Sequence, residues 1–414
     1  MKNSRSVGYR ERALQDRWLE ASAQFPVLFL TGPRQVGKTT MLHHLCEAER
    51  QYVTLDDLAL RTLARQDPEL FLQRFPPPVL IDEVQYAPQL LSSLKLHVDR
   101  KRQPGAFWLT GSQQFPLMKG ISETLAGRVA IVNLLGFSRR EKEQRLISLP
   151  PFLPTADGIK ERSMSAGTTT LAKVYEEIWW GSFPAIATGQ ITNRDLFYRS
   201  YVQTYLERDV RDLVHVGDLE SFHRFLRACA ARTGQLLNYS DLARDCGVSV
   251  NTAKSWLSVL VASFQVYLLP PYHSNLTARL YKTPKLYFLD TGLCAYLTEW
   301  SNPQTLEVGA MSGALFETYA FVELLKSWWH RLEDVNLYYF RDKDGREIDL
   351  LITKDRRLYP LEIKKTATPR PDMIRVFATL ERFKEKSGPG CLLCLYPTPL
   401  PLDAKNSAVP IGLL

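Results

Sequence analysis

The segment Gly32–Thr39 places the strongest constraint on what this chain can fold into. Its letters, GPRQVGKT, fit the pattern of two glycines separated by four residues and followed by Lys and Thr. Pro26–Leu30 before it is an apolar run typical of a buried parallel strand, and Thr39–Leu45 after it has the pattern of an opening helix. A glycine-rich turn between a strand and a helix directs backbone N–H groups at an anion. The sequence therefore predicts a phosphate-binding loop in an α/β domain.

Individual residues of this loop have distinct expected roles. Gly32 and Gly37 allow the backbone to wrap closely around a triphosphate, where a Cβ would collide. Lys38 is expected to contact the β- and γ-phosphates, and the Thr39 hydroxyl to ligate Mg²⁺. ATP and Mg²⁺ are thus the expected cofactors. The predicted nucleotide-binding residues of the loop are Gly32, Pro33, Arg34, Gln35, Val36, Gly37, Lys38, Thr39 and Thr40.

Two adjacent carboxylates end a second apolar run. Pro78–Glu83 is expected to be a strand, and Gln51–Leu55 upstream fits another. Asp82 is predicted to hold the Mg²⁺ shell, and Glu83 to polarise the attacking water. The alternative is that the two acids simply cap a helix, as acids after a strand often do.

Further groups are expected near the γ-phosphate. Ala106–Ser112 is a third apolar strand with small polar residues at its end, so Ser112, or Gln113 beside it, is a candidate phosphate sensor. Arg128 precedes another strand and could reach the γ-phosphate in cis or a neighbouring subunit in trans. A surface ion pair is the alternative for Arg128. Residues 9–24 have the pattern of an amphipathic helix, which would cover the adenine side or only pack.

These motifs together resemble a family of predicted bacterial and archaeal P-loop ATPases, related to the AAA+ proteins, that carry a characteristic C-terminal region. The resemblance implies ATP binding and hydrolysis without indicating a substrate. The stretches that carry it are 30–40 (LTGPRQVGKTT), 81–85 (IDEVQ), 109–112 (LTGS) and 125–128 (LAGR).

The length of 414 residues exceeds one ordinary core and predicts several domains. The expected fold class is α/β: a P-loop ATPase domain of AAA+ type at 1–140, a linker or insertion at 141–173, a helical and winged-helix region at 174–300, and an α/β nuclease-like domain at 301–414. The linker is inferred from its Pro and Gly-Thr clusters, which favour loop over packed structure.

Composition and charge limit the class of protein, the cellular location and the partners that we expect. Hydrophobic residues make up 45% and charged residues 23%, as in globular proteins, and no apolar run is long enough to span a bilayer. A polar N-terminus predicts a cytoplasmic protein without a membrane partner. The net charge of +8 permits nucleic-acid contact. Cys391 and Cys394 lie in an apolar strand pattern without a second cysteine pair, so core thiols are expected rather than zinc ligands.

A helix-turn-helix is expected at residues 238–260. Ser240 would cap the first helix, Gly247 would form the turn, and Ser249 would cap the second helix. Arg279 and Lys282 lie between two following strands, where a basic wing would be. The outward residues predicted to face DNA are Asn251, Thr252, Lys254 and Ser255. Docking of a protein partner is the alternative, because winged helices serve both purposes.

The C-terminal part combines a helix, 313–323, with three strands at 337–340, 347–352 and 358–364. Asp349 lies in the second strand, and strand alternation puts Glu362 and Lys364 on one face of the third. This resembles the D…ExK core of restriction-endonuclease-like nucleases, in which Asp349 and Glu362 would bind Mg²⁺, Lys364 would assist catalysis and Glu317 would add an acid. An active nuclease, a nuclease-like fold kept for binding and an unrelated ion pair remain open.

Two functions follow from these observations. In one, ATP state controls a C-terminal domain that cleaves DNA or RNA. In the other, the protein is a nucleotide-gated switch that recruits a protein partner without cleavage. A trans-acting Arg128 would require a homo-oligomer.

Overall fold

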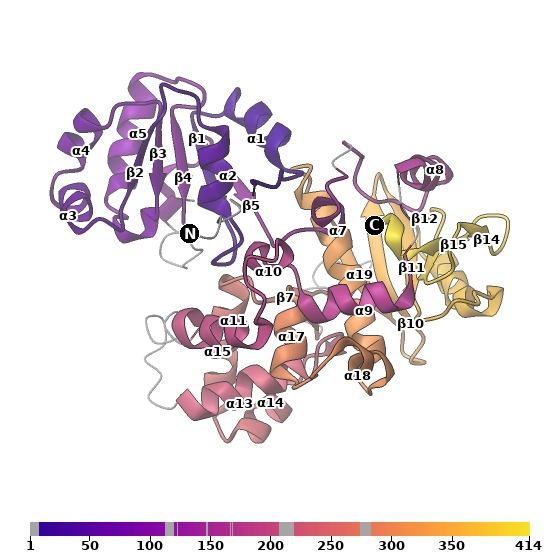
Figure 1. Ribbon diagram of the computed structural model, residues 1–414. Coiled ribbons are helices and arrows are strands. Elements are labelled where there is room, and N and C mark those ends of the chain that lie inside the picture. Colours follow the sequence, from indigo (N-terminus) through magenta and orange to yellow (C-terminus); the bar gives the residue numbers. More distant parts are fainter. Residues whose placement is uncertain are drawn as a thin grey trace, which may run out of the picture.

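The computed structural model describes residues 8–111, 120–121, 123–145, 148–165, 167, 169–206, 219–273 and 283–414. Figure 1 shows an α/β layer formed by the first part of the chain, in indigo and purple, beside a region that runs from magenta helices to a yellow C-terminal sheet. The described strands form three sheets.

The first sheet is parallel, with strand order β2-β3-β4-β1-β5. Its strands are β1 Val27–Thr31, β2 Gln51–Thr54, β3 Val79–Asp82, β4 Phe107–Thr110 and β5 Val129–Asn133. The helices of this part are α1 Gln15–Ser22, α2 Lys38–Leu45, α3 Leu58–Gln66, α4 Pro68–Arg74 and α5 Leu90–Arg100, and a 3₁₀ turn, η1 Val84–Tyr86, follows β3. The strands expected around the loop are therefore confirmed.

Both faces of this sheet are covered because successive strand residues point to opposite sides. Leu28 and Leu30 of β1 pack in one cluster with α1 and α2. Val27 and Phe29 pack in a second cluster with α3, α4 and α5. The loop after β1 consequently opens at the carboxyl edge of a doubly covered parallel sheet, where such sheets bind ligands (Figure 1).

The N-terminal helix is shorter than expected, because it begins at Gln15 instead of near Tyr9. The Gln15 side-chain carbonyl accepts hydrogen bonds from the Tyr9 hydroxyl, at 2.9 Å, and from the Arg12 backbone, at 2.7 Å. The Arg12 guanidinium itself is buried in contacts with distant parts of the chain. These contacts fix residues 8–12 in a non-helical path beside the loop.

The segment expected to be an unpacked linker is in part folded. Helix α7, Arg139–Lys142, ends just inside it, and α8, Ala156–Ser165, lies in its middle. Phe152 is fully buried, and the buried Arg162 of α8 donates to the carbonyl oxygens of Leu413, at 3.0 Å, and Pro150, at 2.8 Å. Contacts with the far end of the chain thus overcome the local loop preference of the proline-rich sequence.

The middle of the chain is helical with a small antiparallel sheet. Its helices are α9 Leu171–Trp180, α10 Pro184–Ala187, α11 Arg194–Tyr201, the π-helical turn η2 Val202–Leu206, α13 Leu219–Ala230, α14 Tyr239–Cys246 and α15 Val250–Ala262. The sheet has the order β6-β8-β7, with β6 Gln235–Leu236, β7 Val266–Leu269 and β8 Lys285–Phe288.

The helix-turn-helix differs from expectation at its first cap. Asn238, not Ser240, caps α14, because its side-chain oxygen accepts from the backbone N–H groups of Ser240 and Asp241. Gly247 adopts the left-handed conformation (φ 70°) in the turn, and Ser249 caps α15 as expected. The expected wing residues Arg279 and Lys282 lie outside the described part of the chain.

The C-terminal region places helices α17 Thr291–Leu297, α18 Pro303–Val308 and α19 Ser312–Trp329 before a mixed sheet. The main path is β14-β15-β13-β11-β10-β9, and β12 pairs with β11. The three expected strands are present as β9 Leu337–Arg341, β10 Glu347–Lys354 and β11 Arg357–Ile363, and they form an antiparallel meander. The remaining elements are η3 Pro371–Arg382, β12 Lys386–Ser387, β13 Cys391–Cys394, β14 Leu400–Pro401, β15 Ser407–Pro410 and η4 Ile411–Leu413.

Helix α19 is buried along most of its length and lies between α9 and the C-terminal sheet (Figure 1). One continuous apolar core includes Leu14 near the start of the chain, Phe321 on α19, and Leu414. Cys391 and Cys394 are buried free thiols in β13, as expected. Among the described residues, none of the helices is long and apolar enough to cross a membrane.

Candidate functional site

The loop between β1 and α2 has a backbone that only small residues can adopt at two points. Gly32 has φ 149°, and a Cβ there would lie 2.0 Å from the carbonyl oxygen of Leu134. Gly37 has φ 85° and precedes the first residue of α2. Both glycines are therefore required by the path of the chain, because other residues adopt positive φ at a cost.

The ammonium group of Lys38 lies within the turn of the loop. It donates to the carbonyl oxygens of Gly32, at 3.0 Å, and Pro33, at 2.8 Å, and the side chain is largely buried. The positive charge of Lys38 thus lies close to the N-terminus of α2. This combination attracts an anion such as a phosphate group.

Three hydroxyl groups converge on the buried carboxylate of Asp82 at the end of β3. The Thr39 hydroxyl lies 3.0 and 3.1 Å from its two oxygens, the Tyr52 hydroxyl lies 3.2 Å away, and the Thr110 hydroxyl also donates to it. Burial, and then the charge of Asp82, raise the pKa of Tyr52 to about 12. Neither Thr110 nor Tyr52 was anticipated, although both lie on strands adjacent to β3.

The Thr39 hydroxyl and the Asp82 carboxylate fit a Mg²⁺ ion, since both are oxygen donors of the kind this ion prefers and they lie in contact beside Lys38. Mg²⁺ retains several water ligands and binds phosphate oxygens, so two protein groups suffice at such a site.

Glu83 has a left-handed backbone (φ 58°), which is unusual for a residue other than glycine. It stands before the short turn η1 but makes no capping hydrogen bond with its side chain, so the capping alternative does not describe it. Its carboxylate instead accepts a hydrogen bond from the side chain of Gln85. Uncommon backbone conformations of this kind cluster at functional sites.

Arg128 lies near the amino-terminal end of strand β1, whereas the loop lies at the carboxyl-terminal end of this strand. Its carbonyl oxygen accepts from the N–H of Val27, the first residue of β1, whereas the loop follows the last residue of β1. Its exposed guanidinium pairs with Asp99 at 2.6 Å. This placement is the surface ion pair and does not allow the cis role, which leaves the trans role as a prediction. Ser112 and Gln113 lie outside the described residues.

A cavity of about 380 Å³ opens beside the loop. Tyr9 and Arg10 of the N-terminal segment line it together with Gly37, Thr40 and Phe137. The ring of Tyr9 stacks on that of His44, with centroids 3.9 Å apart. The segment expected to cover the nucleotide as a helix therefore lines this cavity as an irregular chain.

Arg12 links the loop to the rest of the protein. Its guanidinium donates to the carbonyl oxygens of Val36, at 2.8 Å, and Leu135, at 2.7 Å, and pairs with Glu141 at 2.8 Å. Burial acts to raise the pKa of Glu141, but the charges of Arg12 and His330 outweigh it and lower the pKa to about 2. Both side chains of the Arg12–Glu141 pair are therefore almost completely removed from water.

The C-terminal sheet brings Asp349, Glu362 and Lys364 together. The Lys364 ammonium lies 3.3 Å from Asp349 and 2.9 Å from Glu362. Burial, and then the charge of Asp349, raise the pKa of Glu362 to about 8, and one of its oxygens is buried without a hydrogen-bond partner among the residues that the structure describes. Within the described chain, no group of three or more His, Cys, Asp or Glu residues is arranged to hold a metal ion.

Glu317 of α19 is engaged by other groups nearby. It accepts from the Lys285 ammonium at 3.2 Å and from the Tyr287 hydroxyl. Lys285 also pairs with Glu347 at 2.6 Å. Burial and the charge of Asp349 raise the pKa of Glu317. Sequence reasoning missed Lys285, Tyr287 and Glu347, although Glu347 lies two residues before Asp349 and so on the same face of β10.

The outward face of α15 agrees with expectation only in part, because Thr252 and Ser255 are half-buried. Asn251 and Lys254 are exposed, whereas Ala253 and Trp256 are buried. The Lys254 ammonium lies 5.5 Å from the centre of the Tyr239 ring. Contact of this face with DNA stays a prediction.

Comparison with known proteins divides the chain into three matched parts. Residues 24–142 match the AAA domain family, and this identifies an ATP-binding domain of the P-loop ATPase type. Residues 171–304 and 312–414 match two domains of unknown function, DUF8612 and DUF4143, whose descriptions name no activity.

Two curated relatives match most of the chain. They are the uncharacterized proteins Mb2031c of Mycobacterium bovis and Rv2008c of Mycobacterium tuberculosis, each 30% identical over 345 residues. The match covers 83% of this chain and 71% of each relative.

Solved structures with lower similarity include the Walker-type ATPase Paby2304 of Pyrococcus abyssi, with 16% identity, a TM-score of 0.44 and coverage of 72% of this chain and 98% of that one. Another is the RuvB Holliday junction branch migration motor of Thermotoga maritima, with 20% identity, a TM-score of 0.29 and coverage of 62% and 86%. Scores this low add nothing to the assignment.

Proposed function

Because the chain belongs to the same family as the two mycobacterial proteins and carries an AAA domain of the P-loop ATPase type, we propose that it binds ATP with Mg²⁺ and hydrolyses the bond between the β- and γ-phosphates to give ADP and phosphate. The observation that carries this proposal is the contact of the Thr39 hydroxyl with the Asp82 carboxylate, next to the buried ammonium of Lys38.

Each group has one task in this proposal. The loop backbone and Lys38 bind the phosphates, and Thr39 and Asp82 hold Mg²⁺, which neutralises phosphate charge when bound. Glu83 accepts a proton from the attacking water. The cavity beside Tyr9 and Thr40 takes the adenine, because it adjoins the loop and has apolar and aromatic walls.

Replacement of Lys38 by Ala is expected to weaken ATP binding by about 100-fold, since charge-assisted hydrogen bonds to phosphate contribute about 1.5–3 kcal/mol each. Equilibrium titration with a fluorescent ATP analogue, with Mg²⁺ and with a chelator, measures the change. Lys101→Ala, an exposed lysine of the same domain, is the matched control. Equal affinities of the Lys38 variant and the wild type would contradict the proposal.

A second activity is proposed for the C-terminal cluster: metal-dependent cleavage of DNA or RNA, controlled by the ATP state. What favours it is the buried Glu362 oxygen without a hydrogen-bond partner, close to Asp349 and Lys364. Asp349 and Glu362 would bind Mg²⁺, while Lys285 and Tyr287 occupy Glu317. The competing proposal is a nucleotide-gated switch that recruits a protein partner. Docking would use the exposed face of α15, which in the first proposal would contact nucleic acid.

Incubation with plasmid and single-stranded nucleic acid in Mg²⁺ or Mn²⁺ distinguishes these proposals. If the cluster is catalytic, Lys364→Ala should abolish cleavage, whereas Lys365→Ala should preserve it, because Lys365 contacts the Glu307 backbone instead of the acids. Cleavage should rise as pH increases through about 8, because deprotonated Glu362 would be able to bind metal. No cleavage with or without ATP would favour the switch.

A further inference from the structure

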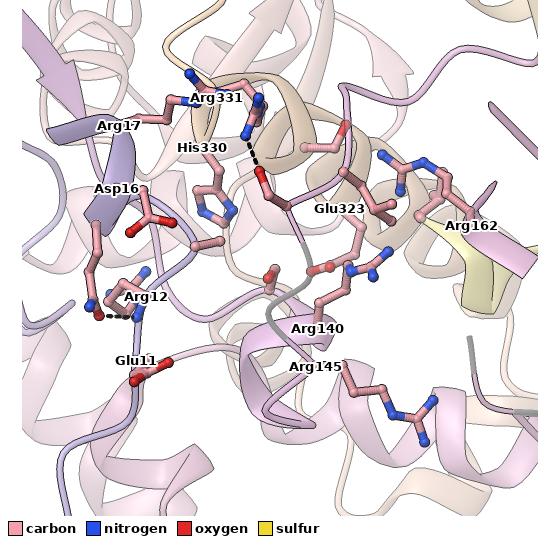
Figure 2. Close-up of a pocket in the computed structure, with 17 residues that line it drawn as sticks. Glu11, Arg12, Asp16, Arg17, Arg140, Arg145, Arg162, Glu323, His330 and Arg331 are labelled. Carbon is pink, nitrogen blue, oxygen red and sulfur yellow. Dashed lines mark hydrogen bonds between the residues drawn. The ribbon is translucent and has the colours of Figure 1, made fainter. Parts of the chain in front are cut away.

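A second cavity, of about 130 Å³, shares Arg12 with the cavity beside the loop and has no lining residue in common with the C-terminal cluster. Its lining comes from residues 11–17, α7, residues 145 and 148–149, α8 and the end of α19. The arginine side chains that line it include Arg17, Arg140, Arg145, Arg162 and Arg331 (Figure 2). Segments distant in the sequence thus contribute arginine side chains to the lining of one cavity.

Three of these arginines, Arg140, Arg162 and Arg331, have no ion pair with a carboxylate among the described residues, and Arg331 donates to the Ser148 hydroxyl at 2.6 Å. Arg162 is 3% exposed and donates only to the backbone carbonyls of Leu413 and Pro150. Arg140 donates to the hydroxyl of Ser165 at 3.1 Å. Burial, and then repulsion from Arg140, lower the pKa of Arg162 to about 9, so it stays protonated at neutral pH. Buried positive charges held this way are costly unless an anion joins them.

Three nitrogen atoms of the lining are buried and have no hydrogen-bond partner in the part of the chain that the structure describes. They are Nε2 of His330, Nε of Arg17 and Nε of Arg331. The His330 side chain is almost fully buried, since the exposed fraction of the residue is 6%, and its Nε2 lies 3.8 Å from the nearest Glu141 oxygen. Buried polar atoms normally have partners, and a bound ligand or ordered water would supply them here.

The acids around the cavity do not balance these charges. Glu323 is already bound by the Lys326 ammonium at 2.9 Å and by the backbone N–H of Arg139 at 2.8 Å. Glu11 and Asp16 belong to the segment that also supplies Arg12 and Arg17. In Figure 2, Arg140, Arg145 and Arg162 lie apart from Glu11 and Asp16. At the α7–α8 side, Arg145 pairs with Glu143 at 3.7 Å, whereas Arg140 and Arg162 have no ion pair among the described residues, so their two positive charges remain unbalanced.

We propose that this cavity binds a small, multiply charged oxyanion of the phosphate or diphosphate class. Guanidinium groups match phosphate oxygens with paired hydrogen bonds, and they remain charged in buried sites. Its volume is close to that of cavities that hold a benzene-sized molecule, at about 150 Å³, which suits a compact oxyanion. The site does not depend on the proposed ATP hydrolysis.

The position of Arg12 gives this site a connection to the nucleotide loop. Arg12 lines the cavity and also donates to the carbonyl oxygen of Val36 in the loop. The Arg12 side chain would therefore connect an anion in the cavity directly with the loop that is proposed to bind ATP.

Calorimetric titration of the Lys38→Ala full-length protein with inorganic phosphate and pyrophosphate, at constant ionic strength, tests the proposal. The Lys38 change weakens anion binding at the loop, so the remaining heat reports on other sites. One-site binding is expected, and adding Arg140→Gln should weaken it at least about tenfold, the effect of losing about 1.4 kcal/mol of contact. Arg244→Gln, an exposed arginine on α14, should leave it unchanged.

Thermal unfolding separates binding from a structural role. Without anion, Arg140→Gln should unfold at the same or a higher temperature than its parent, because it removes repulsion of Arg162. Pyrophosphate should then stabilise the parent and not the variant. The proposal is overturned if neither anion binds, if Arg140→Gln binds as its parent does, or if single-stranded DNA alone shows the Arg140-dependent binding.

Discussion

Exchange of Glu83 for glutamine is expected to leave ATP binding intact and to lower kcat by about 10²- to 10⁴-fold, the usual contribution of a general base. The amide keeps the size of the side chain and can still contact Gln85, but it does not accept a proton from water. Nucleotide affinity should change little, because the phosphate contacts belong to Lys38 and the loop.

Steady-state phosphate release and equilibrium ATP binding measure the two effects separately. Glu47→Gln is a suitable control, since Glu47 lies on the surface of the same domain and pairs with Arg50. Turnover at the wild-type rate in the Glu83 variant would show that another group activates the water, and the assignment of Glu83 would be wrong.

The Glu141→Gln variant is expected to lose about 3–5 kcal/mol of unfolding free energy, the usual cost of removing one partner from a buried ion pair. Arg12 would keep its two carbonyl contacts but would lose the only carboxylate it pairs with among the described residues. Chemical denaturation at pH 7 measures the change. Glu143→Gln is the matched control two residues along the chain, because Glu143 is partly exposed and should cost less.

Lowering the pH should show how much the Arg12–Glu141 pair contributes to the free energy of unfolding. The pKa of Glu141 is about 2 in the folded protein and near its ordinary value of 4.5 when unfolded. The unfolded chain therefore binds this proton first as pH falls, so the contribution of Glu141 is complete above about pH 4.5 and is lost toward pH 2. The wild type should lose stability across this range more steeply than Glu141→Gln. Parallel pH profiles would mean that the pair contributes nothing.

The sequence predicted those parts of the fold that depend on neighbouring residues. The strand, glycine loop and helix around Gly32–Lys38 are one continuous segment, and the periodicity of residues 238–260 is local as well. The cap of the first of these helices was predicted at the wrong residue, because Asn238 and Ser240 are both good capping residues and the local sequence does not distinguish them.

Contacts between distant residues could not be predicted in this way. Arg12 and Glu141 are separated by 129 positions, and no local pattern relates them. The ion pair of Lys285 with Glu317 likewise joins a strand and a helix whose packing is set by the whole core. The cavity arginines come from the expected N-terminal helix, the end of the expected ATPase domain, the expected linker and the end of α19, so no local pattern indicated that they meet.

Helix α19 has a consequence for how this chain can change by recombination. Its Glu323 and Lys326 contact the backbone of Arg139 and Phe137 beside the ATPase domain, while Thr318 bonds to Thr233 in the helical region. A relative's residues 312–414 would bring a helix that fits neither neighbour unless both surfaces changed with it. The three matched parts should therefore be inherited together, and shuffling one alone would break contacts on two sides at once.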